Sequence, residues 1–253
     1  MNTFDRRSEI IRHLQRRQRA STRALSDLFQ VSEVTIRHDL TNLEQQGWIS
    51  RVHGGAEITP QLQGEQPFAL RQTLHAEEKI SIAQAAAKLV QSGDTIILDS
   101  STTAFQLALQ LKEATDLRVM TNNLHVVAML STCAGIEVML LGGLVRNETA
   151  SVVGSPAEEM LARFSADRGF FGAAGLTVER GLVDADLREA QVKRAMVKAA
   201  GQVNVLLDSS KFGRRAFATF ASLAEVDHLF TDEKIPPDYV AACQEAGISL
   251  TVV

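Results

Sequence analysis

Seven short runs rich in apolar residues recur from residue 95 onward, and this pattern constrains the fold more than any other feature. The runs cover residues 95–99, 117–121, 136–141, 169–173, 203–208, 228–231 and 248–253. Stretches with helical character separate most of them, at 77–91, 103–113, 124–132, 156–164, 187–201 and 236–246. Strands that alternate with helices favour a largely parallel sheet covered on both faces. We therefore predict an α/β domain over residues 76–253.

The first 58 residues follow a different pattern. Apolar residues recur at helical spacing over residues 5–17, 22–29 and 32–46, with Ser21 and Ser32 placed as N-caps and Gly47 as the terminator. Residues 48–52 then alternate like a strand, and residues 53–56 turn the chain back toward a second one. Three short helices followed by a hairpin predict a winged helix-turn-helix, an α+β domain, over residues 1–58. Residues 59–75 lack sustained periodicity, so we expect a linker there.

Charge is distributed unevenly between these two parts. The first 55 residues contain nine Arg, no Lys and six Asp or Glu, whereas the remainder contains 17 basic and 24 acidic residues. A basic segment joined to an acidic one indicates that only the first part contacts a polyanion such as DNA. The uneven charge distribution could also have arisen by chance. Sequence motifs are therefore needed to show whether the first part binds DNA.

The third predicted helix carries residues suited to DNA contact. In a helix-turn-helix, the second helix of the pair enters the major groove and its N-terminal residues reach base edges. Arg37 can bind guanine or a phosphate, Thr35 can reach a base edge or a thymine methyl, and Glu33 can accept from a cytosine amine. The expected DNA contacts in the helical part are Ser21, before the second predicted helix, and Ser32, Glu33, Thr35, Arg37 and His38 of the third. Taken alone these residues are also typical of a solvated helix face, but the whole 55-residue arrangement favours DNA binding.

The hairpin that follows supplies a second candidate contact. Arg51, His53 and Gly54 surround its turn. A wing in this position lies beside the DNA backbone or the minor groove. We therefore add these three residues to the expected DNA-binding set.

Polar residues follow the predicted strands of the α/β domain, where open α/β sheets bind ligands. The first group is Asp99, Ser100, Ser101, Thr102 and Thr103, at the start of a predicted helix. Four consecutive hydroxyls over a helix N-terminus can bind a phosphate. Simple N-capping, which needs only one hydroxyl, is the alternative.

Three further groups follow other strands. Thr121 and Asn122 can bind sugar hydroxyls or hold the shape of their loop. Gly142 and Gly143 let the backbone approach a ligand that Arg146 could bind, although a tight turn with a surface arginine is an equal alternative. In the stretch DSSKFG, Asp208 and Lys211 follow the strand expected at 203–208, and Lys211 suits a phosphate or carboxylate.

One more candidate group lies in the stretch GLVDADLREAQVKRAMV. Its notable residues are Asp184, Glu189 and Lys193. Because Glu189 and Lys193 are four apart on a predicted helix, they can form an ordinary i,i+4 ion pair worth a few tenths of a kcal/mol. Alternatively, the cluster contacts a polar ligand. No metal-ligand spacing and no Ser-His-Asp arrangement appears in the sequence.

Several broad classes are unfavoured. The two cysteines, Cys133 and Cys243, match no metal or redox spacing, which is typical of reduced thiols. The opening MNTFDRRSEI lacks the order of a signal peptide, and no stretch approaches a membrane span. We therefore expect a cytoplasmic chain without membrane contact, metal or cofactor.

Residues 31–56, VSEVTIRHDLTNLEQQGWISRVHGGA, resemble the N-terminal signature of the DeoR family of bacterial transcriptional regulators. The strand-end motifs follow in the family's order, so the resemblance spans the chain. It implies a winged helix that binds operator DNA and a sugar phosphate isomerase-like domain that binds a phosphorylated sugar or sugar derivative. Residues 90–103 and the SSKFG motif are most similar to regulators of hexitol and amino-sugar operons. His38 stands where many members carry Arg.

We therefore expect a sequence-specific repressor of a carbohydrate-utilisation operon, controlled by a phosphorylated sugar and active as a homodimer or homotetramer. Two alternatives stay open. One is a sugar phosphate isomerase-type enzyme with an accessory DNA-binding head, in which Asp99, Asp184, Glu189 or Asp208 would be the general base. The other is an architectural DNA binder, which would need no polar strand ends.

Overall fold

The computed structural model describes residues 3–45, 48–58 and 66–253 of the chain. Contacts divide it into two units, Met1–His75 and Ala76–Val253, and each is described by itself. The predicted helix end at Gly47 and the first part of the expected linker, residues 59–65, lie outside the described residues.

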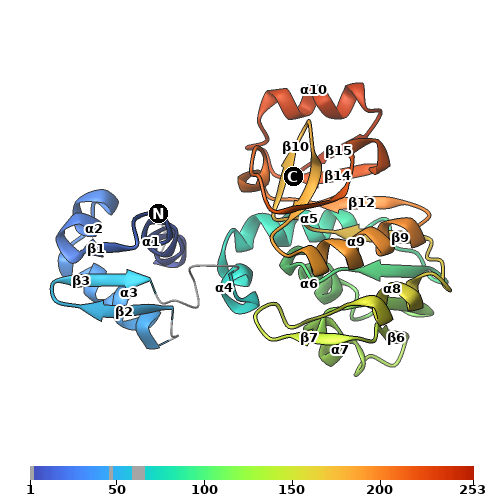
Figure 1. The fold of residues 1–253 in the computed structure, drawn as a ribbon, viewed down its shortest axis with the longest axis horizontal. Coiled ribbons are helices and arrows are strands. Elements are labelled where there is room, and N and C mark those ends of the chain that lie inside the picture. Colours follow the sequence, from blue (N-terminus) through green and yellow to red (C-terminus); the bar gives the residue numbers. More distant parts are fainter. Residues whose placement is uncertain (1–2, 46–47, 59–65) are drawn as a thin grey trace. The chain divides into compact units, whose positions relative to one another are not determined.

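The first unit is a small helical domain with a three-stranded antiparallel sheet (Figure 1). Its elements are α1 (Thr3–Arg17), β1 (Arg19–Ser21), α2 (Thr22–Phe29), α3 (Glu33–Gln45), β2 (Ile49–Val52), β3 (Gly55–Ile58) and α4 (Phe68–Thr73). Ile10, Leu14, Leu25, Leu40 and Leu43 form its core, all fully buried. The predicted winged helix-turn-helix is confirmed. Strand β1 was not expected, because three residues between two helices are too short to show a period.

The stretch expected to be a linker, residues 59–75, contains a short helix. Helix α4 occupies Phe68–Thr73, and Leu70 and Leu74 pack in the core of the first unit. This helix has six residues, fewer than two turns, so its apolar spacing was too brief to identify from the sequence.

The second unit contains a seven-stranded parallel sheet in the order β15-β14-β12-β9-β4-β5-β6 (Figure 1). The strands are β4 (Thr95–Leu98), β5 (Leu117–Thr121), β6 (Ile136–Leu140), β9 (Arg168–Phe171), β12 (Val203–Leu206), β14 (His228–Thr231) and β15 (Ser249–Val252). Each lies within or overlaps one of the seven apolar runs. The predicted α/β fold with a parallel sheet is therefore confirmed.

Helices cover both faces of this sheet, and alternate strand residues divide between them. Ile96 and Leu98 pack with α5 (Ala76–Ala87), α6 (Thr102–Gln110) and α7 (Leu124–Leu130). Ile97, between them, belongs to the other core, with residues of α8 (Ser155–Leu161), α9 (Leu187–Ala199) and α10 (Pro237–Glu245). Side chains that alternate in this way bury both faces of the strand, which explains the continuous apolar runs.

Two smaller sheets were not expected from the sequence. Strands β7 (Leu144–Arg146) and β8 (Ser151–Val153) form an antiparallel hairpin. Strands β10 (Gly175–Thr177), β11 (Gly181–Asp184) and β13 (Ala218–Ala221) form an antiparallel sheet. All have three or four residues, and two of them carry candidate site residues, Arg146 and Asp184.

Candidate DNA-binding and effector sites

Helix α3 is fixed in the first unit by its buried side and by one buried carboxylate. Ile36, Leu40 and Leu43 are fully buried beneath it. Asp39 is 1% exposed and accepts hydrogen bonds from Arg6 Nε at 2.6 Å and Arg7 Nε at 2.8 Å. Sequence reasoning did not assign Asp39 a role. Its position, three residues from Ile36 and one from Leu40 on the buried side, is the signal that could have found it.

The predicted DNA-contacting side chains lie on the exposed side of α3 or near its start. Ser32 accepts from the backbone N–H of Thr35 at 3.1 Å, and the two hydroxyls lie 2.9 Å apart. Arg37 donates to Glu33 at 2.9 Å, and both side chains are largely exposed. His38 is exposed, with Asn42 Nδ2 donating to its carbonyl. These polar groups are therefore available at a surface.

The wing residues and Ser21 have structural partners. Arg51 donates to the Gly55 carbonyl at 3.3 Å, whereas His53 and Gly54 are exposed at the turn. Gly54 has a φ of 77°, which favours glycine. Ser21 caps α2 by accepting from the backbone N–H of Ala24 at 3.1 Å.

In the second unit, four neighbouring strands bring their carboxyl ends together. Strands β12, β9, β4 and β5 are adjacent, and Asp208, Gly172, Asp99 and Asn122 follow them within two residues. The carboxyl ends of parallel strands share one edge, where open α/β sheets bind ligands. The predicted groups of the effector site thus lie along one edge of the sheet.

A buried lysine joins two of these groups. Lys193 Nζ lies 3.0 Å from Asp99 Oδ2 and 2.7 Å from Asp184 Oδ2, and donates to the Gly172 carbonyl at 3.0 Å. Asp99 also accepts from the backbone N–H groups of Ser101 and Gly172, both at 2.9 Å. This network fixes the loops after β4 and β9 against α9.

A second network gathers around the buried carboxylate of Glu189. It accepts from Ser100 Oγ at 3.0 Å, Thr149 Oγ1 at 3.1 Å and Arg146 at 3.0 Å, and also from Ser151 Oγ. The three groups from residues 146–151 belong to the β7–β8 hairpin. Glu189 therefore ties that hairpin to the loop after β4.

The tertiary contacts of Glu189, Lys193 and Arg146 exclude two of the alternatives that the sequence left open. Glu189 and Lys193 do not form the i,i+4 pair that their spacing suggested, because each has nearer partners elsewhere. Arg146 is not a surface arginine: its side chain is 9% exposed and also lies 3.3 Å from Asp186. Sequence reasoning missed Thr149 and Ser151, which belong to a hairpin with strands too short to predict. It also missed Asp186, although an Asp directly before the predicted helix at 187 is an N-cap signal.

The charges of these groups are mutually stabilised. Burial alone would lower the pKa of Lys193, but the attraction of Asp184 and Asp99 outweighs it, so that pKa is raised and the ammonium stays charged. The hydrogen bond from Arg188, with further attraction from Arg146, lowers the pKa of Asp186. Lys193 and Asp186 are therefore both charged at neutral pH.

The other predicted effector residues line the same edge with varied partners. Ser101 caps α6 by accepting from Ala104 N–H at 3.1 Å, as the N-capping alternative required, and Thr102 and Thr103 are buried in its first turn. Thr121 accepts from Asn123 N–H at 3.0 Å, and Asn122 donates to the Val152 carbonyl at 3.1 Å, which holds the loop shape. Within the described residues, Asn122 Oδ1 is buried without a hydrogen-bond partner.

The glycines and the DSSKFG motif complete the set. Gly143 lies so close to β8 that a Cβ would stand 2.4 Å from the Val153 carbonyl oxygen, whereas a Cβ on Gly142 would meet nothing within 4 Å. Asp208 accepts from Ser210 N–H at 3.1 Å and begins a short 3₁₀ helix, Ser209–Lys211. Lys211 thus ends a helical turn at this edge.

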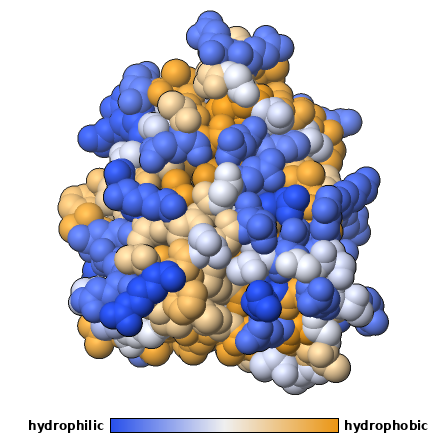
Figure 2. Space-filling model, turned by 90° about the vertical axis from the view of Figure 1, so that its right-hand side faces the viewer, coloured by the Kyte–Doolittle hydropathy of each residue, from blue (hydrophilic) through white to orange (hydrophobic). Residues whose placement is uncertain are grey.

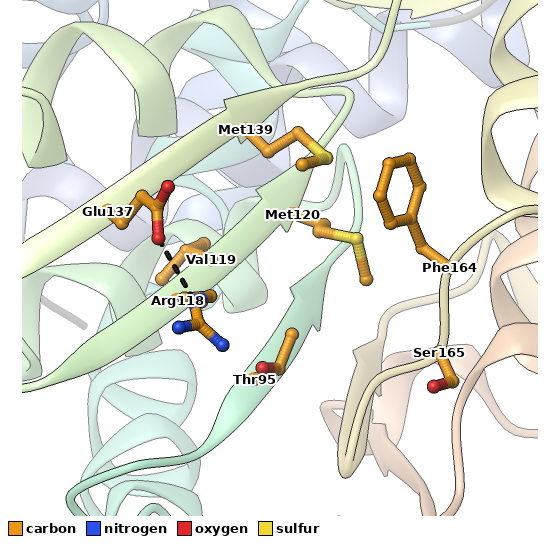
Figure 3. Close-up of a pocket in the computed structure, with 8 residues that line it drawn as sticks. All are labelled: Thr95, Arg118, Val119, Met120, Glu137, Met139, Phe164 and Ser165. Atoms are coloured by element: carbon orange, nitrogen blue, oxygen red, sulfur yellow. Dashed lines mark hydrogen bonds and ion pairs between the residues drawn. The ribbon is translucent and has the colours of Figure 1, made fainter.

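A separate cavity has a volume of about 280 Å³, and none of the predicted effector residues lines it. It is lined by Thr95, Arg118, Val119, Met120, Glu137, Met139, Phe164 and Ser165 (Figure 3). Thr95 and Arg118 lie at the amino ends of β4 and β5, whereas Met120 and Met139 lie near the carboxyl ends of β5 and β6. In the described part of the chain, no three metal-ligand side chains gather and no helix is long and apolar enough to span a membrane.

Family comparisons agree with this two-part architecture. Residues 6–61 match the DeoR-like helix-turn-helix domain, and residues 74–233 match the DeoR C-terminal sensor domain. The chain belongs to the DeoR family. The resemblance noted in the sequence is therefore confirmed.

Relatives of this DeoR protein are named as regulators. The putative aga operon transcriptional repressor of Escherichia coli O157:H7 is 35% identical, over 99% of this chain and 94% of its own length. The repressor GlcR of Bacillus subtilis is 36% identical over 96% and 93%. The glycerol-3-phosphate regulon repressor of Escherichia coli is 32% identical over 99% of each chain. This DeoR protein is accordingly a DNA-binding transcriptional regulator and not an isomerase-type enzyme.

Solved structures are similar only at a distance. A ribose 5-phosphate isomerase from Methanocaldococcus jannaschii has a TM-score of 0.40 with 20% identity, and it covers 54% of each chain.

Proposed function

We propose that this protein represses a carbohydrate-utilisation operon and that a phosphorylated sugar, bound at the polar edge of its second unit, controls it. The observation that carries the proposal is the Glu189 network, because it gathers donors from the loop after β4 and from the β7–β8 hairpin within a matched sensor domain. Relatives named as repressors of the aga operon and of the glycerol-3-phosphate regulon support the same class of function.

Operator contact is assigned to the exposed side of α3 and to the wing. Arg37, held by Glu33, has the geometry to bind guanine or a phosphate. Ser32, Thr35 and His38 supply further hydrogen-bonding groups, and Arg51 and His53 approach the backbone or minor groove. Ser21 and Gly54 shape the start of α2 and the wing turn.

The effector is assigned to the groups at the carboxyl edge. The N–H groups in the first turn of α6, with Thr102, Thr103 and Lys211, suit the phosphate, since helix N-termini favour anions. The carboxylates of Asp99, Asp184 and Asp208 suit sugar hydroxyls, which donate hydrogen bonds. Arg146 and Lys193 balance this negative charge, and Asn122 offers a buried oxygen without a described partner.

Regulation requires that the effector bind two arrangements of the protein with different affinity. The β7–β8 hairpin is suited to this role because Arg146, Thr149 and Ser151 all bind the carboxylate of Glu189, beside the contacts that Arg146 makes with Asp186 and Val152 makes with Asn122. A phosphate is a strong partner for an arginine and competes directly with that carboxylate. Effector binding would then release or tighten the hairpin.

A homodimer or homotetramer would place two or more helix-turn-helix domains on one operator in the cytoplasm. One helix-turn-helix reads a short site, and symmetric pairs read two half-sites. Figure 2 shows apolar side chains exposed among polar ones on one face. Leu144, Phe164 and Phe217 of the second unit are exposed apolar residues that oligomer contacts could bury.

A thermal-shift screen of the full chain tests the effector assignment. Phosphorylated sugars are compared with their unphosphorylated counterparts, since a ligand that binds only the folded state raises Tm. One phosphosugar should raise Tm, and Lys211→Met should remove the rise while Lys198→Met, an exposed lysine on α9, should keep it. A rise that persists in Lys211→Met, or no rise with any phosphosugar, contradicts the assignment.

A further inference from the structure

Helix α3 presents one continuous exposed stripe. Val34, Arg37, His38 and Thr41 are exposed and stand at positions i, i+3, i+4 and i+7, which share a helix face. Ile36, Leu40 and Leu43 are buried on the opposite side. Because the first unit is a DeoR-like helix-turn-helix domain, this stripe is the side of α3 that faces the major groove.

Val34 is the apolar member of that stripe. Its side chain is 72% exposed, in the first turn of the helix. Its neighbours Glu33 and Thr35 are engaged within the protein, by Arg37 and Ser32 respectively. Val34 therefore offers bare methyl groups where N-terminal residues of such a helix reach base edges.

Thymine is the base that matches this surface. Its C5-methyl group lies in the major groove, and apolar side chains recognise it by contact. A β-branched valine in a helix strongly prefers one χ1 rotamer, so it loses little side-chain entropy when it contacts a base. We propose that Val34 recognises a thymine methyl and so sets one position of the operator sequence. Thr35, the residue expected from sequence to touch such a methyl group, is less exposed than Val34, and its hydroxyl is bonded to Ser32.

Removal of single methyl groups from the DNA tests this proposal. An operator is selected from a random duplex library with the full chain, and each thymine of one half-site is replaced in turn by deoxyuridine. At one position the replacement should weaken binding by the wild type about fourfold, the scale of one buried methyl group. Val34→Ala should bind the original operator about as weakly as the wild type binds the substituted one. Its affinity should not change further when that thymine is replaced.

Leu28→Ala is the matched control, because Leu28 is also exposed but lies on α2. It should retain the wild-type response at every thymine. If no thymine shows a deoxyuridine effect that Val34→Ala abolishes, the proposal is overturned while sequence-specific binding stands. If no sequence is enriched from the library, sequence-specific binding and this proposal fail together. Neither outcome depends on the effector.

Discussion

Lys193 Nζ lies 2.7 Å from Asp184 Oδ2, inside a domain where both side chains are almost fully buried. Asp99 lies 3.0 Å from the same ammonium group. One positive charge thus holds two carboxylates, one after β4 and the other at the end of β11. Because these two segments are about 85 residues apart in the chain, the contact defines the shape of the polar edge.

Removal of that charge should destabilise the second unit. In Lys193→Met, Asp99 and Asp184 lose their cation while they stay buried, which typically costs about 3–5 kcal/mol in the free energy of unfolding. Urea unfolding of the full chain measures the change. Lys198→Met, on the exposed side of the same helix, should stay within about 0.5 kcal/mol of wild type. Equal stability of the two variants would refute the role assigned to Lys193.

Neutralisation of Glu189 should loosen the β7–β8 hairpin. In Glu189→Gln, one acceptor oxygen becomes a donor, so part of the set Ser100, Arg146, Thr149 and Ser151 loses its partner. Amide hydrogen exchange should quicken over residues 144–153, since local opening becomes easier. Glu159→Gln, on the exposed side of α8, should leave exchange there unchanged. Unaltered protection of the hairpin in Glu189→Gln would contradict the network's role.

Truncation of Arg37 should weaken operator binding without loss of fold. A bidentate arginine contact to guanine is worth about 1–3 kcal/mol, so affinity for a selected operator should fall roughly 5- to 150-fold in Arg37→Ala. Fluorescence anisotropy with labelled operator measures it. Arg118→Ala is the control, because Arg118 is an exposed residue of β5 in the second unit and its removal leaves the first unit unchanged. Wild-type affinity in Arg37→Ala would exclude α3 as the recognition helix.

His228 should make stability depend on pH. Burial lowers the pKa of its imidazole below 6.5, so near that pH the unfolded chain binds the proton more readily than the folded one. The contribution of neutral His228 is complete above pH 6.5 and is lost as pH falls below it. Between pH 7.5 and 5.5, the unfolding free energy of wild type should therefore decline more than that of His228→Gln. Equal declines would show that His228 is not involved.

How much of the molecule could be predicted depended on the length of each element. All seven strands of the parallel sheet were identifiable because buried strands of this kind are continuous apolar runs, as in TIIL at 95–98. The β7–β8 hairpin was missed because LVR and SVV are three residues each, too short for a period to appear.

The sequence indicated which residues to consider for the candidate site, but it did not indicate which of them pair with one another. Asp99, Glu189 and Lys193 were found from residue type and place along the chain. That Lys193 would pair with Asp184 and Asp99, and not with Glu189, depends on how α9 packs on the sheet, which local spacing does not specify. The partner of Arg146 was likewise not predictable, because only the tertiary fold brings Arg146 against Glu189.

The most direct test of the effector-controlled repressor is operator binding in the presence of sugars. Anisotropy of a selected operator with the full chain is titrated with each phosphorylated sugar and with its unphosphorylated counterpart. One phosphosugar should change operator affinity at least about fivefold, the lower range of allosteric coupling, while its unphosphorylated counterpart should leave the affinity unchanged. Operator affinity that no phosphosugar alters, or that both forms of the sugar alter equally, would contradict this prediction.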